Sequence, residues 1–371
     1  MNKIGLYLHV PFCRKKCLYC DFYSLADPSD LGAYEKALCR DLAFWGQSLK
    51  KPSVETLYFG GGTPSLLGAS ELERILLAVR EHFFLEKTAE ITLEMNPESV
   101  TEEKLFSAKK NAVNRISLGM QSADDGELNS IGRLHRFSDT RRAVNLVKAA
   151  GIRNVSLDLM YGLPGQSLDS FRKSLEAALS LEPQHISFYC LTLSPEVPLY
   201  QKRDELPHEE AVREMYLFAH SFLEQAGFEH YEISNAALPG YRSRHNERYW
   251  TGRDYLGIGP GAHSLLRGER FQYAADLKKF ILHSKPFDTI ENRELLTPRD
   301  RLVEYVMLSL RRKEGLDLFD LTRLSDEAFA ESCARKMASW EKHGLCRKTS
   351  AGFALTPEGF FVSNGIISEL I

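Results

Sequence analysis

The chain has 371 residues, 43% of them hydrophobic and 26% charged, so it can form one large folded domain and a smaller one. Its net charge of −3 provides no sequence-wide basic field, which argues against nucleic acid as a partner. No apolar run reaches the roughly 18–20 residues that a membrane span needs, and the start of the chain lacks the features of a signal peptide. We therefore expect a cytoplasmic protein without a transmembrane segment.

One pattern recurs from the start of the chain to about residue 195: a short apolar run ends in a polar or glycine-rich segment, and a stretch of helical periodicity follows. The runs predict strands at Ile4–Val10, Thr56–Phe59, Glu90–Met95, Arg115–Met120, Asn154–Met160 and His185–Leu193. Because the runs are nearly continuous, we expect parallel strands covered on both faces. Six strand–helix units form either a curved, incomplete TIM-like barrel or a flat, doubly wound sheet.

The pattern changes after about residue 195, where prolines, glycines and aromatic residues interrupt the segments. We expect a core barrel over residues 1–240, a connecting segment over 241–295 and a smaller α+β domain over 296–371. The last region combines helical stripes with a hairpin whose turn is Ala351-Gly352, which indicates a winged-helix-like domain. A packing or docking module is the ordinary interpretation of such a domain, and DNA binding is the alternative.

Three of the seven cysteines are clustered directly after the first predicted strand. Cys13, Cys17 and Cys20 have the spacing C-x₃-C-x₂-C, and Phe22 follows where a C-x-C pair would place a fourth. An odd number of cysteines without a signal peptide argues against a disulfide framework. Structural zinc sites and ferredoxin clusters usually have four ligands. The triad therefore predicts an iron–sulfur cluster with one vacant iron position, and zinc is the alternative.

Glycine and polar residues stand at the ends of the next four predicted strands. The loop after the second strand contributes Gly61, Gly62 and Thr63. Glycines there either let backbone approach a ligand amine or simply form a tight turn. Glu94, Gln121 and Asp158 lie at or near the ends of the third, fourth and fifth strands. Each could be a helix cap, but their succession beside the cysteine triad predicts a shared ligand site at the strand ends.

Several other residues have an ordinary structural explanation beside a functional one. Arg133 could pair with a ligand carboxylate through its guanidinium fork, or it could be a surface arginine. Tyr7 alternates with apolar neighbours and would be a core tyrosine by itself. Cys39 and Cys190 are predicted to be buried thiols, because isolated cysteines behave as small apolar residues.

A C-x₃-C-x₂-C triad after a first strand resembles the radical S-adenosylmethionine (SAM) superfamily. In that superfamily three cysteines hold a [4Fe–4S] cluster, and the amine and carboxylate of SAM chelate the open iron. An electron from the reduced cluster then cleaves the sulfonium. The resemblance implies a partial (β/α)6 barrel, and it places Tyr19, the residue before the last cysteine, near the adenine.

Longer pieces of the chain are similar to the HemN/HemW group of that superfamily. The similar pieces are YLHVPFC, CLYCDFYS, YFGGGTPS, EMNPES, SLGMQS, GRLHR, DLMYGLPGQS and HNERYW. The SAM-contacting positions of the group correspond here to Tyr7, Tyr19, Gly61, Gly62, Thr63, Glu94, Gln121, Arg133 and Asp158. The group also has a HemN-type C-terminal domain, which corresponds to residues 296–371.

Two departures distinguish the branches of the group. The HemN branch, oxygen-independent coproporphyrinogen III oxidase, typically has a further cysteine at the position of Phe22 and a longer extension than the twelve residues before Cys13. Both departures resemble the HemW branch, which consists of haem chaperones. This resemblance implies haem as a ligand and haem-accepting proteins, such as respiratory enzymes, as partners. It is also compatible with a homodimer and with peripheral membrane contact. Oxidative decarboxylation of coproporphyrinogen III is the alternative, and SAM cleavage is left open.

The HemW branch also carries an H-N-x-x-Y-W motif, which is His245–Trp250 here. The imidazole of His245 could ligate haem iron, and the aromatic residues Tyr249 and Trp250 could pack on a porphyrin. Without the resemblance, a core histidine hydrogen-bonded among aromatic residues is the ordinary interpretation. With it, His245 becomes the candidate haem contact.

Overall fold

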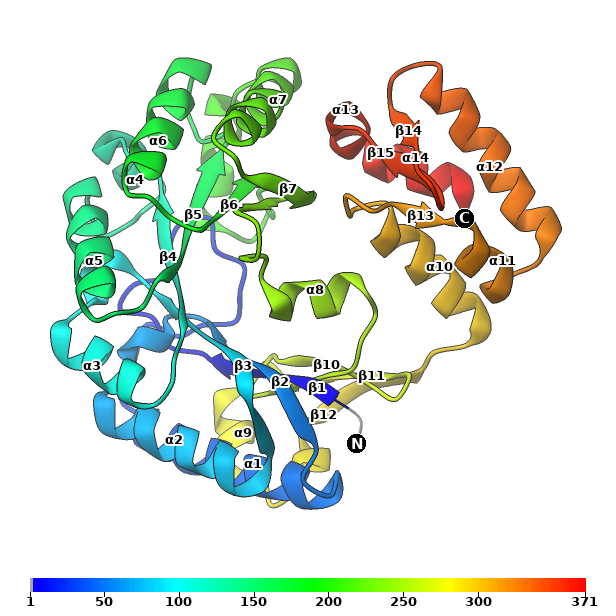
Figure 1. Ribbon diagram of the computed structural model, residues 1–371. Coiled ribbons are helices and arrows are strands. Elements are labelled where there is room, and N and C mark those ends of the chain that lie inside the picture. Colours follow the sequence, from blue (N-terminus) through cyan, green and yellow to red (C-terminus); the bar gives the residue numbers. More distant parts are fainter. Residues whose placement is uncertain (1–2) are drawn as a thin grey trace.

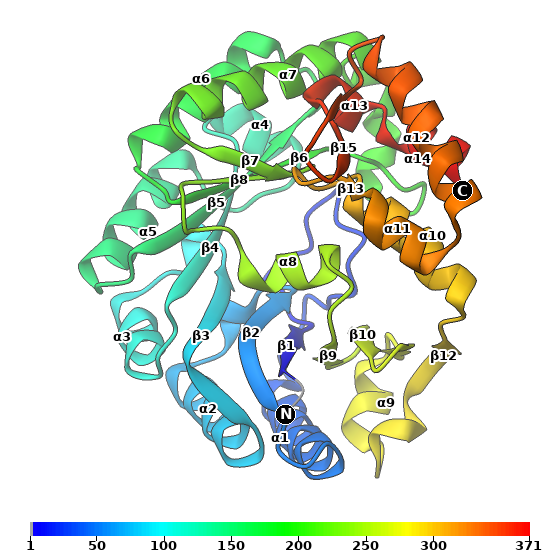
Figure 2. The ribbon, with the colours of Figure 1, turned by 45° about the vertical axis from the view of Figure 1, so that its right-hand side comes forward.

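A curved sheet forms the centre of the computed structural model, which describes residues 3–371 (Figures 1 and 2). The strand order is β12-β11-β10-β9-β1-β2-β3-β4-β5-β6-β8-β7. Strands β1 to β6 are parallel and follow one another in chain order, and β9 pairs in parallel with the free side of β1. Their bounds are β1 Lys3–Val10, β2 Ser53–Gly61, β3 Phe84–Met95, β4 Arg115–Gln121, β5 Asn154–Tyr161, β6 His185–Cys190 and β9 Tyr255–Ile258.

The strand order decides between the two architectures that the sequence allows. A doubly wound sheet begins in its middle and reverses direction, whereas these strands proceed around the sheet in chain order, as they do in a (β/α) barrel. The connecting helices lie on the outer, convex side of the sheet (Figure 2). They are α1 Leu31–Ser48, α2 Ala69–His82, α3 Glu102–Lys110, α4 Asp125–Ser130, α5 Phe137–Ala149, α6 Leu168–Ser180 and α7 Glu209–Gln225. The predicted partial barrel is therefore confirmed.

The two faces of the parallel sheet differ in chemistry. In β3, Ile91 and Leu93 belong to the buried apolar core beneath the helices. Glu90, Thr92 and Glu94 alternate with them and face the concave side, because successive side chains of a strand point to opposite faces. The expectation of strands covered on both faces holds for the concave side only near the amino ends of β2 and β3, where a helix packs inside the barrel, and the rest of this side surrounds a cavity.

Shorter antiparallel strands extend the sheet at both edges. They are β8 Asn235–Ala237 and β7 Glu229–Glu232 beside β6, and β10 His263–Leu266, β11 Glu269–Tyr273 and β12 Ile290–Leu295 beside β9. Residues 241–295, predicted as a connection, thus contribute β9 to β12 as well as α8 Arg244–Trp250 and α9 Leu277–Leu282. Helix α8 crosses the inside of the barrel near the amino ends of β1 to β3 (Figure 2).

The C-terminal domain lies on the open side of the barrel, between the two edges of the sheet (Figures 1 and 2). Its elements are α10 Pro298–Ser309, β13 Leu316–Asp317, α11 Leu318–Leu324, α12 Glu327–Glu341, β14 Cys346–Lys348, β15 Gly352–Leu355, α13 Pro357–Phe361 and α14 Ser363–Leu370. The predicted hairpin is formed by β14 and β15. Ion pairs join the domain to both edges: Arg213 of α7 pairs with Glu358, and Arg270 of β11 pairs with Glu304.

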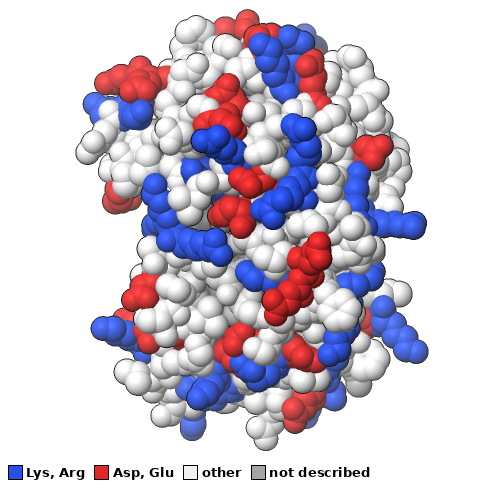
Figure 3. All heavy atoms as spheres, turned by 90° about the vertical axis from the view of Figure 1, so that its left-hand side faces the viewer, with Lys and Arg blue, Asp and Glu red and all other residues white. Residues whose placement is uncertain are grey.

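The surface carries both signs of charge in close mixture. On the side shown in Figure 3, acidic and basic side chains are interspersed, and neither forms an extended area of its own. Within residues 3–371, no helix combines the length and the apolar character that crossing a membrane requires.

Candidate functional site

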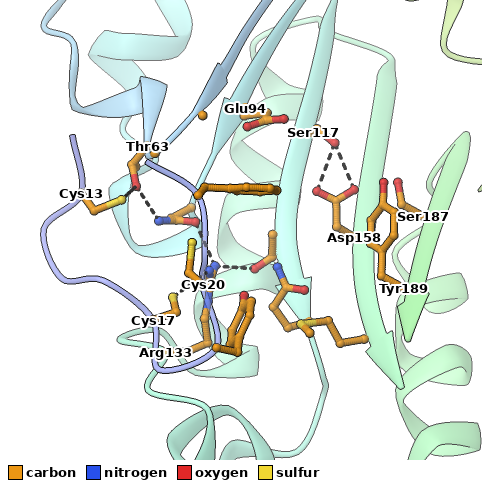
Figure 4. A pocket seen from close by; sticks show the side chains of 18 of the residues that line it. Cys13, Cys17, Cys20, Thr63, Glu94, Ser117, Arg133, Asp158, Ser187 and Tyr189 are labelled. Atoms are coloured by element: carbon orange, nitrogen blue, oxygen red, sulfur yellow. Dashed lines mark hydrogen bonds between the residues drawn. The ribbon is translucent and has the colours of Figure 1, made fainter. Parts of the chain in front are cut away.

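A cavity of about 520 Å³ opens at the carboxyl ends of the parallel strands and continues into the barrel (Figure 4). Its walls come from the loop after β1, the glycine-rich loop after β2 and the concave face of β2 to β6. The predicted site residues that line it are Cys13, Cys17, Tyr19, Cys20, Gly61, Gly62, Thr63, Glu94, Gln121, Arg133 and Asp158. Tyr7 and His245 lie outside this lining.

The three cysteines lie in the loop that follows β1. Thr63 donates a hydrogen bond from Oγ1 to Cys13 Sγ at 3.5 Å, and Arg133 donates from Nη1 to Cys17 Sγ at 3.6 Å. Among residues 3–371, no three His, Cys, Asp or Glu side chains are grouped so that they could hold a metal ion. The thiolates of a cubane cluster bind different irons and need not converge on one point. Three thiols from one loop at a cavity therefore fit a cluster with one open corner.

The glycine-rich loop packs directly against the cysteine loop. The backbone N–H groups of Gly62 and Thr63 donate to the carbonyls of Val10 at 2.8 Å and Phe12 at 2.7 Å. A Cβ on Gly62 would lie 2.6 Å from the Phe12 carbonyl oxygen, and Gly61 has φ +108°. Side chains are therefore excluded at Gly61 and Gly62, and the backbone of these two residues lines the cavity. The contact of this backbone with a ligand amine stays a prediction.

A chain of hydrogen bonds connects the first two cysteines of the loop (Figure 4). Arg133 donates from Nη2 to Asn96 Oδ1 at 2.9 Å and to the Gly119 carbonyl at 2.7 Å. Asn96 donates in turn to Thr63 Oγ1 at 3.1 Å. Since Thr63 and Arg133 also donate to cysteine sulfurs, this chain fixes the positions of the thiols relative to the strand ends. Arg133 is thus an internal tether and not a free surface arginine.

Two carboxyl groups face the cavity from β3 and β5. Tyr58 donates to Glu94 Oε1 at 2.6 Å, and Ser117 donates to the Asp158 carboxylate at 3.2 and 3.3 Å. Burial raises the pKa of Glu94 to about 7, although the hydrogen bond from Tyr58 opposes the rise. Burial also raises the pKa of Asp158, and the positive charge of Arg115 offsets part of this rise. Carboxyls in this setting can accept hydrogen bonds from ligand hydroxyls or attract a cationic ligand.

Gln121 ends β4 in a strained backbone conformation. Its φ is +63°, in the left-handed region that residues other than glycine rarely adopt, and the register between β4 and β5 shifts at this point. Strain of this kind is common where a side chain is held toward a ligand. The strain distinguishes Gln121 from an ordinary end of a strand.

Tyr7 and His245 lie on the other side of Tyr58 from the cavity. The ring of His245 stacks on Tyr58, with 5.1 Å between the ring centroids. Its Nδ1 is 2.8 Å from Thr56 Oγ1 and its Nε2 is 2.8 Å from the Tyr249 hydroxyl. Burial, assisted by nearby arginine charges, lowers the pKa of His245 to about 3, so the ring is neutral. Both nitrogens have partners, and direct contact with a haem iron would require one of these bonds to break.

Comparison with known proteins identifies the family. The Radical SAM superfamily matches residues 7–178, and the HemN C-terminal domain matches residues 296–362. "Heme chaperone HemW" of Synechocystis sp. is 35% identical over 98% of this chain and 95% of that protein. The Escherichia coli protein of the same name is 39% identical over 92% of this chain and 95% of its own length. The chain belongs to the HemW family.

The fold of this HemW-family chain is shared with a solved structure, coproporphyrinogen III oxidase (HemN) from Escherichia coli. The TM-score is 0.86, and the match covers 100% of this chain and 90% of that one at 24% identity. At this level of identity the likeness shows a common fold, and it confirms the predicted radical SAM barrel with a smaller C-terminal domain. Membership in the radical SAM superfamily implies a [4Fe–4S] cluster and SAM.

The structure of the HemW-family chain also corrects one prediction at the mouth of the cavity. Cys190 was expected to be buried, but it is exposed and lines the cavity. The predicted strand ran to Leu193, whereas β6 ends at Cys190, so the thiol lies at a strand end. Tyr189 and Phe22 also line the cavity, and they are 41% and 63% exposed. The entrance to the cavity is thus partly aromatic.

Proposed function

We propose that this HemW-family protein is a haem chaperone that binds haem and passes it to haem-requiring proteins. The observation that carries the proposal is the match to proteins named "Heme chaperone HemW" from several bacteria, at 32% to 39% identity over most of the chain. Phe22 supports it, since the oxidase branch of the group typically has a cysteine at that position.

We infer that Cys13, Cys17 and Cys20 hold the [4Fe–4S] cluster that the superfamily implies. SAM would bind next to it, at the carboxyl ends of the parallel strands. The bound cluster and SAM would supply one-electron cleavage of a sulfonium. The side chains of Thr63 and Arg133 support cluster binding, because they donate hydrogen bonds to the sulfurs of Cys13 and Cys17 and so orient these ligands. Glu94, Gln121, Asp158 and Tyr19 are the proposed SAM contacts. Tyr7, whose ring centroid lies 6.1 Å from that of Tyr58, is proposed to support the site through Tyr58.

We place haem in the cavity, with one edge at the aromatic mouth and the opposite edge, which carries the propionates, toward the inside of the barrel. Phe22, Tyr189 and Leu191 line the mouth, and such side chains pack well on the flat face of a porphyrin. The motif residue His245 is proposed to act on haem indirectly. It supports Tyr58 by stacking, and Tyr58 in turn lines the cavity.

Anaerobic reconstitution with haem tests this proposal. We expect uptake of haem by the cluster-loaded protein, seen in its absorbance spectrum and with a haem stain, and a protein that takes up no haem would overturn it. His245→Ala should weaken uptake, whereas His343→Ala, at an exposed histidine of the C-terminal domain, should leave it unchanged. If the two variants take up equal amounts of haem, His245 has no role in haem binding.

The same preparation tests the remaining parts of the proposal. Transfer of haem to an apo form of a respiratory haem protein would support the chaperone role, and failure to transfer it would contradict that role. Incubation of the reduced protein with SAM and coproporphyrinogen III would reveal the alternative activity as formation of protoporphyrinogen. Size-exclusion chromatography with and without SAM would show whether two copies of the chain associate.

A further inference from the structure

The cavity extends to a buried arginine at the inner end of the barrel. Arg115 is the first residue of β4, lines the cavity and is only 2% exposed. Its Nε has no hydrogen-bond partner among residues 3–371. Burying a charged donor without a partner is unfavourable, because the group loses its hydration and gains nothing in return. An unpaired guanidinium that faces a cavity therefore indicates a partner supplied by a ligand.

The carboxyl groups near Arg115 are engaged elsewhere. Glu90 accepts hydrogen bonds from the backbone N–H groups of Arg244 and His245, at 3.2 and 3.0 Å, and thereby anchors the start of α8. Asp158 accepts from Ser117 on the adjacent strand (Figure 4). Burial lowers the pKa of Arg115, but the charges of these groups raise it overall, so the guanidinium stays protonated. It is a fixed positive charge within the barrel.

A second unpaired group lies beside it. Thr92 of β3 is the register partner of Arg115, and its buried Oγ1 also lacks a hydrogen-bond partner among the residues described. Both residues face the concave side, because Glu94 and Ser117, two positions further along their strands, line the cavity. Two adjacent unpaired polar groups, one of them cationic, form a site for an anionic group with hydrogen-bond acceptors.

We propose that Arg115 and Thr92 bind a carboxylate of a ligand that enters the barrel through the cavity. The guanidinium fork matches the two oxygens of a carboxylate, and the threonine hydroxyl can donate a further hydrogen bond. β4 spans about 20 Å from Arg115 to Gln121, since a strand rises about 3.3 Å per residue. The carboxylate of SAM is expected at the cluster, near the far end of β4. We therefore assign the inner subsite to a propionate of haem, an assignment that rests on the proposed haem binding.

The test compares haem with haem dimethyl ester, in which both propionates are masked. Absorbance titrations of the cluster-loaded, full-length wild type should show that free-acid haem binds about tenfold or more tightly, as expected for hydrogen bonds to a charged group. Arg115→Gln and Thr92→Val should bring this ratio toward one, and SAM binding by equilibrium dialysis should not change. Arg153→Gln, at an exposed arginine just before β5, is the matched control and should keep the wild-type ratio.

Each outcome bears on a separate claim. Equal affinity of the wild type for acid and ester would overturn the carboxylate subsite even if both variants failed to fold. Loss of SAM binding in Arg115→Gln, with the haem ratio intact, would assign the arginine to SAM and overturn the propionate assignment. If the wild type binds neither haem nor its ester, the proposed function itself fails, and the assignment with it. The melting temperature supplies an independent measure, because removal of an unpaired charge should not lower it in the ligand-free protein.

Discussion

Replacement of Glu94 by glutamine should make the stability of the protein less dependent on pH. Burial raises the pKa of Glu94 from 4.5 to about 7. A carboxyl whose pKa is higher in the folded than in the unfolded chain favours folding fully below pH 4.5, and this contribution is lost as the pH rises through 7. At about 1.36 kcal/mol per pH unit, the rise corresponds to roughly 3 kcal/mol. Glutamine keeps the volume and an acceptor for Tyr58 but does not titrate.

Urea unfolding of the protein without cluster and SAM, at pH 5 and at pH 8, measures this effect. The free energy of unfolding of Glu94→Gln relative to wild type should increase by roughly 2.5 kcal/mol between these pH values, because part of the effect already develops below pH 5. The pKa of Glu232 is also raised by burial, to about 7, but Glu232 titrates in both proteins and cancels from the difference. Glu103→Gln, at an exposed position, should show no such increase. A difference that is constant between the two pH values, or larger at pH 5, would refute the reasoning.

Three further predictions concern the cluster and the floor of the barrel. Cys20→Ser should abolish iron and sulfide incorporation after anaerobic reconstitution. The control Cys333→Ser, at a buried site in the C-terminal domain, should incorporate as much iron and sulfide as wild type does. Equal incorporation by the two variants would contradict the assignment of Cys20 as a cluster ligand. Arg133→Lys loses the guanidinium hydrogen bonds that join the cysteine loop to the strands. The cluster absorbance should therefore decay several-fold faster than in wild type when a chelator is present. An unchanged rate of decay would show that Arg133 does not hold the cysteine loop in place. Arg248→Met removes a buried guanidinium that donates hydrogen bonds to the Glu55 carboxylate and to the carbonyls of Lys3 and Asp254. It should reduce the free energy of unfolding by about 3 kcal/mol in urea, and a loss below about 1 kcal/mol would contradict this figure.

The parallel strands were predictable because each contains a local apolar run, and the observed strands include all six runs almost completely. The strands β7 to β12 were not predicted. They are short, and their pairing depends on a neighbouring edge that the local pattern does not reveal. β3 begins at Phe84, six residues before the predicted start at Glu90, because Phe84 and Leu85 already pair with β2 ahead of an irregularity in the register. Local sequence thus predicts the six central parallel strands better than the short strands that flank them.

The site was predictable where a motif carries it and not where side chains face the inside of the barrel. The cysteine triad, the glycine loop and the polar strand ends gather at one cavity, as expected from the geometry of parallel strands. Arg115, Ser117 and Gly119 were missed, although their alternation with Ile116 and Leu118 in β4 is visible in the sequence. Because residues 115–120 look like one nearly continuous apolar run, the sequence did not indicate that one face of this strand is polar.

The close contact at Gly62 has a consequence for assembly. A Cβ on Gly62 would lie 2.6 Å from the Phe12 carbonyl oxygen, so the cysteine loop and the glycine loop have no slack between them. Movement of the backbone at Cys13 during metal insertion would displace the backbone that is proposed to receive the amino acid part of SAM. We therefore expect the metal to be loaded before SAM. Transplanting the metal-binding loop into another barrel would require transfer of the glycine loop with it.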